Sequence, residues 1–241
     1  MLSKFIKPGC KLELQAVNKV NDGTEETKKV YHSQVHDIIS EDRMEITMPM
    51  EQTKLILLPV DGEYDAVFYS GANLYQCFLR IIDRYKSNNV YILVVEMTSN
   101  LRKYQRREYY RFSCALEMCA RPLVEEEVKA VEQKEAYFLT PGLPLKRSVI
   151  VDISGGGLRF MSEQRYEPES MVYCNYQLFV DGKSRECEII GKILSVKEAE
   201  NKKGTYEHRV QYVNLGVNDR EEIIKYIFEE ERKNRRREKG L

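Results

Sequence analysis

Three arginines lie close together near the middle of the chain: Arg106, Arg107 and Arg111, within residues 105–112. An arginine can hold a phosphate in a fixed orientation, because its planar guanidinium offers paired N–H donors and stays charged at physiological pH. Clustered arginines where two halves of a chain meet therefore suggest a site for an anionic ligand. A solvated basic linker would carry the same residues, and the cluster alone does not separate the two interpretations.

A second candidate segment lies in the latter half, where a predicted strand at 148–151 runs into residues 152–157, Asp-Ile-Ser-Gly-Gly-Gly. Glycines can adopt backbone conformations closed to other residues, and turns lined by backbone N–H groups bind anions. The carboxylate of Asp152 would repel a phosphate, so we expect it to accept a hydrogen bond from a base edge or to hold an arginine. Ser154 adds a hydroxyl.

The glycines allow two other interpretations. A dinucleotide-binding turn also begins with a strand followed by glycines, but it requires a helix next. Here an apolar run at 158–161 and a polar turn before Pro168 follow instead. A tight β-hairpin turn without a ligand remains the alternative.

Composition limits the class of protein. The 241 residues contain 38 Lys and Arg against 38 Asp and Glu, so any anion site must be local, and no general nucleic-acid-binding surface is expected. The six cysteines include no C-x-x-C pair, and we expect them to be reduced and mostly buried. The apolar run at 55–60 is far shorter than the roughly 20 residues that cross a bilayer, and no leader is evident, so a soluble cytoplasmic protein is predicted.

Short alternating apolar segments separated by turns fill the first half of the chain. Such a series predicts an all-β barrel or sandwich. The predicted strands are 11–17, 30–35, 44–48, 55–58, 64–68, 74–82 and 90–96, the fourth of them more fully buried, with turns at 21–23, 61–62 and 88–89. His32 and His36 have the spacing of metal ligands on a helix, but they fall in a predicted strand, so no metal site is expected.

The second half begins with a polar segment, 99–104, that is typical of a linker. Strands are predicted at 112–119 and 148–151, and a short apolar run follows the glycines at 158–161. The acidic segment 122–144 is interpreted as a tolerated insertion, either a short surface helix or a mobile loop. A helix capped by Asn218 or Asp219 should follow, with an apolar stripe of Ile223, Ile224, Ile227 and Phe228. Its basic end predicts a solvated, frayed tail, with nucleic-acid or membrane contact as the alternative.

Two separated motifs, taken together, resemble the PilZ domain, a receptor for the bacterial second messenger cyclic di-GMP. Arg107 and Arg111 match R-x-x-x-R, while Asp152, Ser154 and Gly157 match D-x-S-x-x-G. The resemblance continues through strands at 171–179, 188–196 and 208–212, as a six-stranded PilZ barrel requires. The preceding lobe is similar to the N-terminal domain of YcgR-type flagellar brake proteins. The acidic segment departs from the compact PilZ pattern.

The resemblance implies a fold and a set of ligand contacts. The fold would be mainly β: a YcgR-like barrel (residues 1–98), a linker (99–106), a PilZ barrel with a C-terminal helix (107–230) and a basic tail (231–241). In the family the arginine motif folds over the ligand, contacting phosphates and guanine edges, and the glycine turn contacts guanine and phosphate. An arginine just before the motif is associated with binding a stacked ligand dimer. The implied contacts are Arg106, Arg107, Arg111, Asp152, Ser154, Gly156 and Gly157, while Tyr104 and Tyr109 could stack on a base or simply pack.

The function expected from this resemblance is a non-enzymatic cyclic di-GMP receptor. Ligand binding would change the geometry between the lobes and regulate flagellar motility through a motor, stator or switch protein, with possible recruitment to the flagellar basal body. No cofactor, metal or nucleic acid is expected, and the chain should be a monomer or weak dimer. The alternatives are another cyclic di-GMP output such as exopolysaccharide or adhesion, a partner-binding protein with a decayed ligand site, and an enzyme acting on nucleotides.

Overall fold

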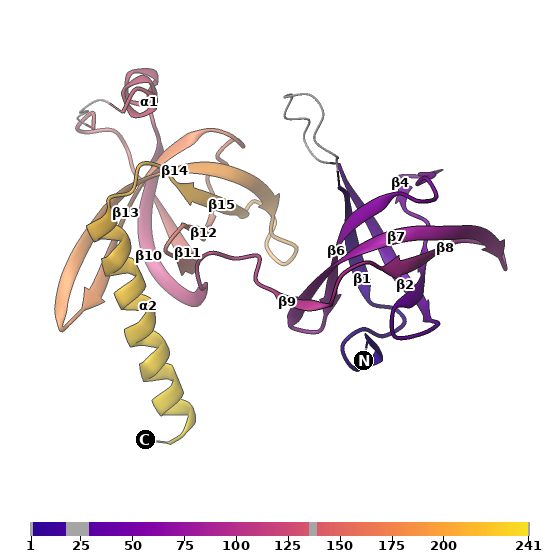
Figure 1. Cartoon of the computed structure of the whole chain (residues 1–241). Helices are drawn as coiled ribbons and strands as arrows, with labels where there is room; N and C mark the ends of the chain where they lie inside the picture. The colour runs from indigo at the N-terminus through magenta and orange to yellow at the C-terminus, as the bar shows by residue number, and fades with distance from the viewer. Residues whose placement is uncertain (1, 18–28, 135–138, 241) are drawn as a thin grey trace. The chain divides into compact units, whose positions relative to one another are not determined.

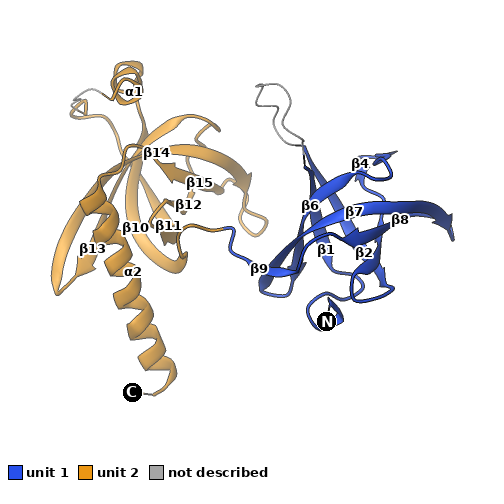
Figure 2. Ribbon diagram, viewed as in Figure 1, with its two compact units in different colours: residues 1–106 blue, residues 107–241 orange. Residues whose placement is uncertain are grey.

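The computed structural model describes residues 2–17, 29–134 and 139–240. The chain forms two compact units, residues 1–106 and 107–241 (Figure 2). Each unit contains its own antiparallel β-barrel, as Figure 1 shows. The predicted mainly β fold, with two barrels and a C-terminal helix, is confirmed.

The first unit is a closed ring of six strands. Going round it the order is β6-β1-β2-β3-β8-β7, and pairing of β7 with β6 completes the ring, while β9 pairs with β7. Its elements are a 3-10 helix (Leu2–Lys4), β1 (Lys11–Ala16), β2 (Val30–Ile38), β3 (Arg43–Thr47), β4 (Met50–Glu51), β5 (Lys54–Leu55), β6 (Glu63–Ser70), β7 (Asn73–Ser87), β8 (Val90–Met97) and β9 (Arg102–Tyr104).

Sequence alternation explains the burial in this barrel. In β1, Leu12 and Leu14 are buried in the core while Lys11 and Glu13 point outward, as the period-two side-chain pattern of a strand requires. The predicted turns at 61–62 and 88–89 lie between strands. The hairpin predicted at 21–23 lies outside the described residues.

The predicted buried strand at 55–58 is wrong. Only Lys54–Leu55 pairs, in the two-stranded β4–β5 hairpin, and both residues are exposed. Leu57 is 66% exposed, Leu58 is buried in the core, and Ile56 is partly buried against it. A run of leucine and isoleucine indicates hydrophobic content but does not identify a pairing partner. Part of the segment expected as a linker is also a strand, since Arg102–Tyr104 forms β9.

The second unit is a closed barrel with strand order β10-β11-β12-β15-β14-β13. Its elements are β10 (Phe112–Pro122), α1 (Glu125–Glu132), β11 (Lys146–Ser154), β12 (Gly157–Ser162), β13 (Met171–Val180), β14 (Lys183–Glu198), β15 (Tyr206–Tyr212) and α2 (Val217–Glu238).

Helix α2 adds three buried side chains, Ile223, Tyr226 and Ile227, to the barrel core. Phe228, which was predicted to belong to the apolar stripe, is 58% exposed, and Tyr226 is buried instead. The predicted cap is also wrong: the N-cap is Gly216, without a side-chain hydrogen bond. The helix continues to Glu238, so the basic residues near the end are helical rather than frayed, and Figure 1 shows these turns extending beyond the barrel.

The acidic segment contains an anchored helix, α1. Glu127 receives two hydrogen bonds from Arg121, at 2.8 and 2.7 Å, and the side chains of both residues are almost fully buried. The same carboxylate accepts from the backbone N–H groups of Val124 and Thr140. These bonds hold the pKa of Glu127 down at about 2, chiefly through Arg121. The start of the segment is therefore part of the barrel structure.

Candidate ligand-binding site

The candidate turn joins β11 to β12, with Gly155 and Gly156 at its tip. Ser154 and Gly157 face each other across the hairpin, and the Ser154 hydroxyl donates to the Gly157 carbonyl at 2.9 Å. The Gly156 carbonyl accepts from the Tyr212 N–H at 3.1 Å. The turn is thus closed by its own hydrogen bonds and tied to β15.

The glycines of this turn provide space rather than unusual backbone angles. None of the three has φ in the left-handed region, so the expectation based on conformational freedom is wrong here. A Cβ on Gly157 would stand 2.1 Å from the Val210 carbonyl oxygen, and one on Gly155 would stand 2.6 Å from the ring of Tyr109. Other atoms occupy the space that a side chain would need.

Tyr109 lies between the two motif arginines in sequence, and its ring packs on the glycine turn. Arg220, from the first turns of α2, donates through Nη1 to the Tyr109 hydroxyl at 3.0 Å and to the Gly155 carbonyl at 2.8 Å. Its guanidinium carbon lies 5.2 Å from the centroid of the Tyr109 ring. Of the two roles considered for Tyr109, packing is the one the structure shows. Sequence reasoning missed Arg220 because nothing local to it indicates this contact.

Asp152 holds an arginine, as one of its two expected roles required. It lies opposite Arg159 in the β11–β12 pairing and accepts from Arg159 Nε at 2.6 Å. Arg159 also donates to Glu207 on β15 at 2.8 Å. The guanidinium partly offsets the carboxylate charge beside the turn. Arg159 was not predicted, although its cross-strand position follows once the hairpin register is known.

The arginine cluster is divided between the two units. Arg107 and Arg111 belong to the second unit, lie in the irregular segment before β10, and are exposed. Arg106 belongs to the first unit, where its Nη1 donates to the Tyr69 hydroxyl at 2.8 Å and lies 3.4 Å from Glu13 Oε2. The Tyr69 hydroxyl itself donates to Glu13 at 2.6 Å. Six of the seven predicted residues therefore share one unit, and Arg106 is held by the other.

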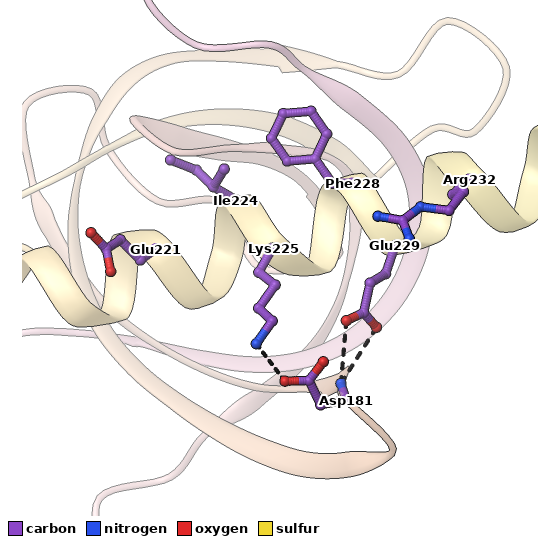
Figure 3. Close-up of a pocket in the computed structure, with 7 residues that line it drawn as sticks. All are labelled: Asp181, Glu221, Ile224, Lys225, Phe228, Glu229 and Arg232. Carbon is purple, nitrogen blue, oxygen red and sulfur yellow. Dashed lines mark hydrogen bonds and ion pairs between the residues drawn. The ribbon is translucent and has the colours of Figure 1, made fainter.

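Two cavities in the described part of the chain lie away from the candidate ligand residues. A cavity of about 560 Å³ in the second unit lies between α2 and the β13–β14 turn (Figure 3). Asp181 in it bonds to Lys225 and, through its backbone N–H, to Glu229. A larger cavity of about 990 Å³ lies in the first unit. No predicted ligand residue lines either cavity.

The described residues contain no group of three or more His, Cys, Asp or Glu side chains suited to hold a metal ion. Cys77 and Cys174 are buried and the other four cysteines are half-buried, so burial is less complete than expected. Burial raises the pKa of Cys77 and Cys174 to about 12, which keeps both thiols protonated and poorly nucleophilic. None of the helices in the described ranges is long and apolar enough to span a membrane.

Fold and site define a two-barrel protein whose second barrel carries an arginine pair and a tight glycine hairpin in one compact unit. A family model described as "PilZ domain" matches residues 105–229, more than half of the chain, so the chain belongs to the PilZ domain family. A second model, described as "Flagellar protein YcgR", matches residues 7–97. The resemblance drawn from the two motifs is confirmed. Proteins of this type are ligand-binding regulatory proteins and not enzymes.

Three solved structures are similar to this chain, and the first of them shares its fold. The Bacillus subtilis inhibitor of motility, MotI/DgrA, is 17% identical, with a TM-score of 0.72 over 96% of this chain and 100% of that one. Escherichia coli YcgR in complex with c-di-GMP is 14% identical, with a TM-score of 0.48 over 99% and 90% of the two chains. The K. pneumonia MrkH–c-di-GMP complex is 13% identical, with a TM-score of 0.41 over 98% and 91%. No curated protein matches the chain.

Proposed function

We propose that this protein is a cyclic di-GMP receptor that regulates flagellar motility through a protein partner. The observation that carries the proposal is the placement of both family motifs in one barrel: Arg107 and Arg111 in the segment leading into β10, and the glycine turn between β11 and β12. Tyr109 connects the two motifs, because it belongs to the arginine segment (residues 105–111) and its ring packs on the glycine turn.

The chemistry of the ligand fits these residues. Cyclic di-GMP carries two phosphodiester charges and two guanine bases. Exposed guanidinium groups of Arg107 and Arg111 can bind phosphate oxygens or the O6 and N7 atoms of guanine in a bidentate manner. Asp152 can accept from a guanine N–H while Arg159 offsets part of its charge. We include Arg106, Ser154, Gly156 and Gly157 as further contacts.

Regulation of motility is inferred from the relatives. The first half matches the family model named for flagellar protein YcgR, and the B. subtilis protein of the same fold is an inhibitor of motility. We expect ligand binding to order the linker between the two units, to change the geometry between them, and to present a surface to a motor, stator or switch protein in the cytoplasm.

Isothermal titration with cyclic di-GMP tests the proposal. Arg107→Ala and Arg111→Ala should each weaken binding by about 1.5–3 kcal/mol, the range for hydrogen bonds to charged groups. Arg147→Ala is the matched control, because Arg147 is an exposed arginine of the same barrel, near the start of β11. Wild-type protein that shows no heat of binding at micromolar concentrations would refute the proposed function.

A further inference from the structure

Tyr109 has a closer relation to the glycine turn than ordinary surface packing. A Cβ on Gly155 would lie 2.6 and 3.0 Å from two carbons of the Tyr109 ring, and one on Gly156 would lie 3.0 and 3.4 Å from two others. A side chain at either position would push the ring away. The absence of a Cβ at Gly155 and Gly156 therefore makes room for the Tyr109 ring. This explains glycine at both positions, although their φ values do not require it.

Arg220 holds the Tyr109 ring against these two glycines. Its Nη1 bonds both the Tyr109 hydroxyl and the Gly155 carbonyl, and its guanidinium lies over the ring at 5.2 Å from the centroid. Hydrogen bonding and cation–π attraction thus act on the same pair of residues. Because Arg220 is on α2, three elements that are distant in sequence meet at this ring: the arginine segment, the β11–β12 turn and the helix.

The arginine segment has no regular secondary structure between β9 and β10. Tyr109 is two residues from Arg107 and two residues from Arg111, so fixing its ring limits the positions of both guanidinium groups. A ligand that must order a free segment loses the corresponding conformational entropy from its binding free energy, whereas an anchored segment avoids most of that cost.

We propose that Tyr109 and Arg220 are positioning residues that hold Arg107 and Arg111 beside the glycine turn for ligand capture. This inference rests on the proposed cyclic di-GMP site. Arg220 acts through Tyr109, and its bonded Nη1 faces the turn and the ring. Neighbouring Tyr110 does not share the role: it is 57% exposed, and its hydroxyl makes one long hydrogen bond, 3.4 Å, to Glu231.

Calorimetric titration of single variants with cyclic di-GMP tests the inference. Tyr109→Ala should weaken binding about tenfold, as expected for releasing a fixed segment. Arg220→Ala should weaken it about threefold, and Arg220→Lys should restore little because lysine cannot reproduce the planar contact. Tyr110→Ala is the control and should stay within about twofold of wild type. Thermal unfolding of each variant identifies any that fail to fold, and Tyr109→Phe, which retains the ring, then supplies a milder test.

A double-mutant cycle separates positioning from general stability. Tyr109→Ala combined with Arg107→Lys should weaken binding by less than the product of the two single effects, because both changes disturb the same contact. Purely multiplicative effects would overturn the inference. Tighter binding by Tyr109→Ala would also overturn it, since the ring would then be a cover that the ligand displaces.

Failure of this inference can be told apart from failure of the proposed function. If wild type binds and Arg107→Ala loses binding while Tyr109→Ala and Arg220→Ala bind normally, only the positioning role is wrong. If wild type does not bind at micromolar ligand, the proposed function itself is wrong.

Discussion

Both barrels close six antiparallel strands, but the turns at 61–62 and 88–89 of the first barrel and the glycine turn of the second use different residues for different reasons. The turns of the first barrel include Asp61, Asn88 and Asn89 at φ values of 64°, 46° and 68°, so short polar side chains meet a demand of the backbone. The glycine turn of the second barrel has no such demand, and its glycines instead admit atoms from β15 and the Tyr109 ring.

The barrels also differ in how they hold charge. In the first barrel the Arg80–Glu63 ion pair is exposed, with side chains 44% and 42% accessible to solvent. The second barrel buries the Arg121–Glu127 pair at 4% and 3%. Water screens the first pair and not the second, so equal substitutions should have unequal costs.

The largest expected effect concerns this buried pair. Glu127→Ala leaves the Arg121 guanidinium buried without its carboxylate and should lower the free energy of unfolding by about 3–5 kcal/mol. Glu63→Ala in the first barrel should cost less than about 1 kcal/mol. Urea unfolding followed by circular dichroism measures both. Similar costs for the two variants would remove the distinction between the barrels.

Gly157→Ala should cause the next largest loss of stability. The added Cβ would meet the Val210 carbonyl oxygen at 2.1 Å, a backbone atom that cannot rotate away, so we expect a loss of about 3 kcal/mol. Gly71 in the first barrel has φ of +58° and open space around it, and Gly71→Ala should cost about 1 kcal/mol. Thermal unfolding of the two variants would contradict the comparison if Gly71→Ala were the more damaging.

His208, in the second barrel, should make stability depend on pH. It is fully buried and stacks on Phe160, and burial lowers its pKa to about 4 from the usual 6.5. Between these values the unfolded chain binds a proton that the folded chain does not, so the free energy of unfolding falls as pH falls, by roughly 1 kcal/mol per pH unit. Urea titrations from pH 7 to 4.5 should show this slope in wild type and in the exposed-site control His36→Gln, and lose it in His208→Gln. If His208→Gln kept the same pH dependence, a group other than His208 would be responsible for it.

The smallest expected effect concerns Arg106, which the first barrel holds through Tyr69 and Glu13. If Arg106 contacts the ligand, those bonds compete with it. Glu13→Gln should then tighten cyclic di-GMP binding by about 0.5 kcal/mol, the scale of an exposed ion pair. Glu63→Gln makes the same change of charge in the same barrel and should leave binding unchanged. Equal effects of the two variants in calorimetry would point to net charge alone.

The strands could be predicted because apolar and polar residues alternate along a strand that buries one face, as with Leu12 and Leu14 of β1. The strand predicted at 55–58 failed because burial also needs a partner strand, which a run of apolar residues does not specify. At the site, the motif residues could be found by their types and spacing. Arg159 and Arg220 could not, because one is placed by hairpin register and the other by the path of α2.

The central claim is that the second barrel binds cyclic di-GMP through the arginine segment and the glycine turn. Nuclear magnetic resonance of the ¹⁵N-labelled full chain during ligand titration tests it most directly, because each backbone amide reports its own surroundings. We predict the largest shifts at residues 107–111 and at Gly155, Gly156 and Gly157, with β3 and β8 of the first barrel nearly unchanged. Shifts centred on the first barrel, or none at saturating ligand, would contradict the claim.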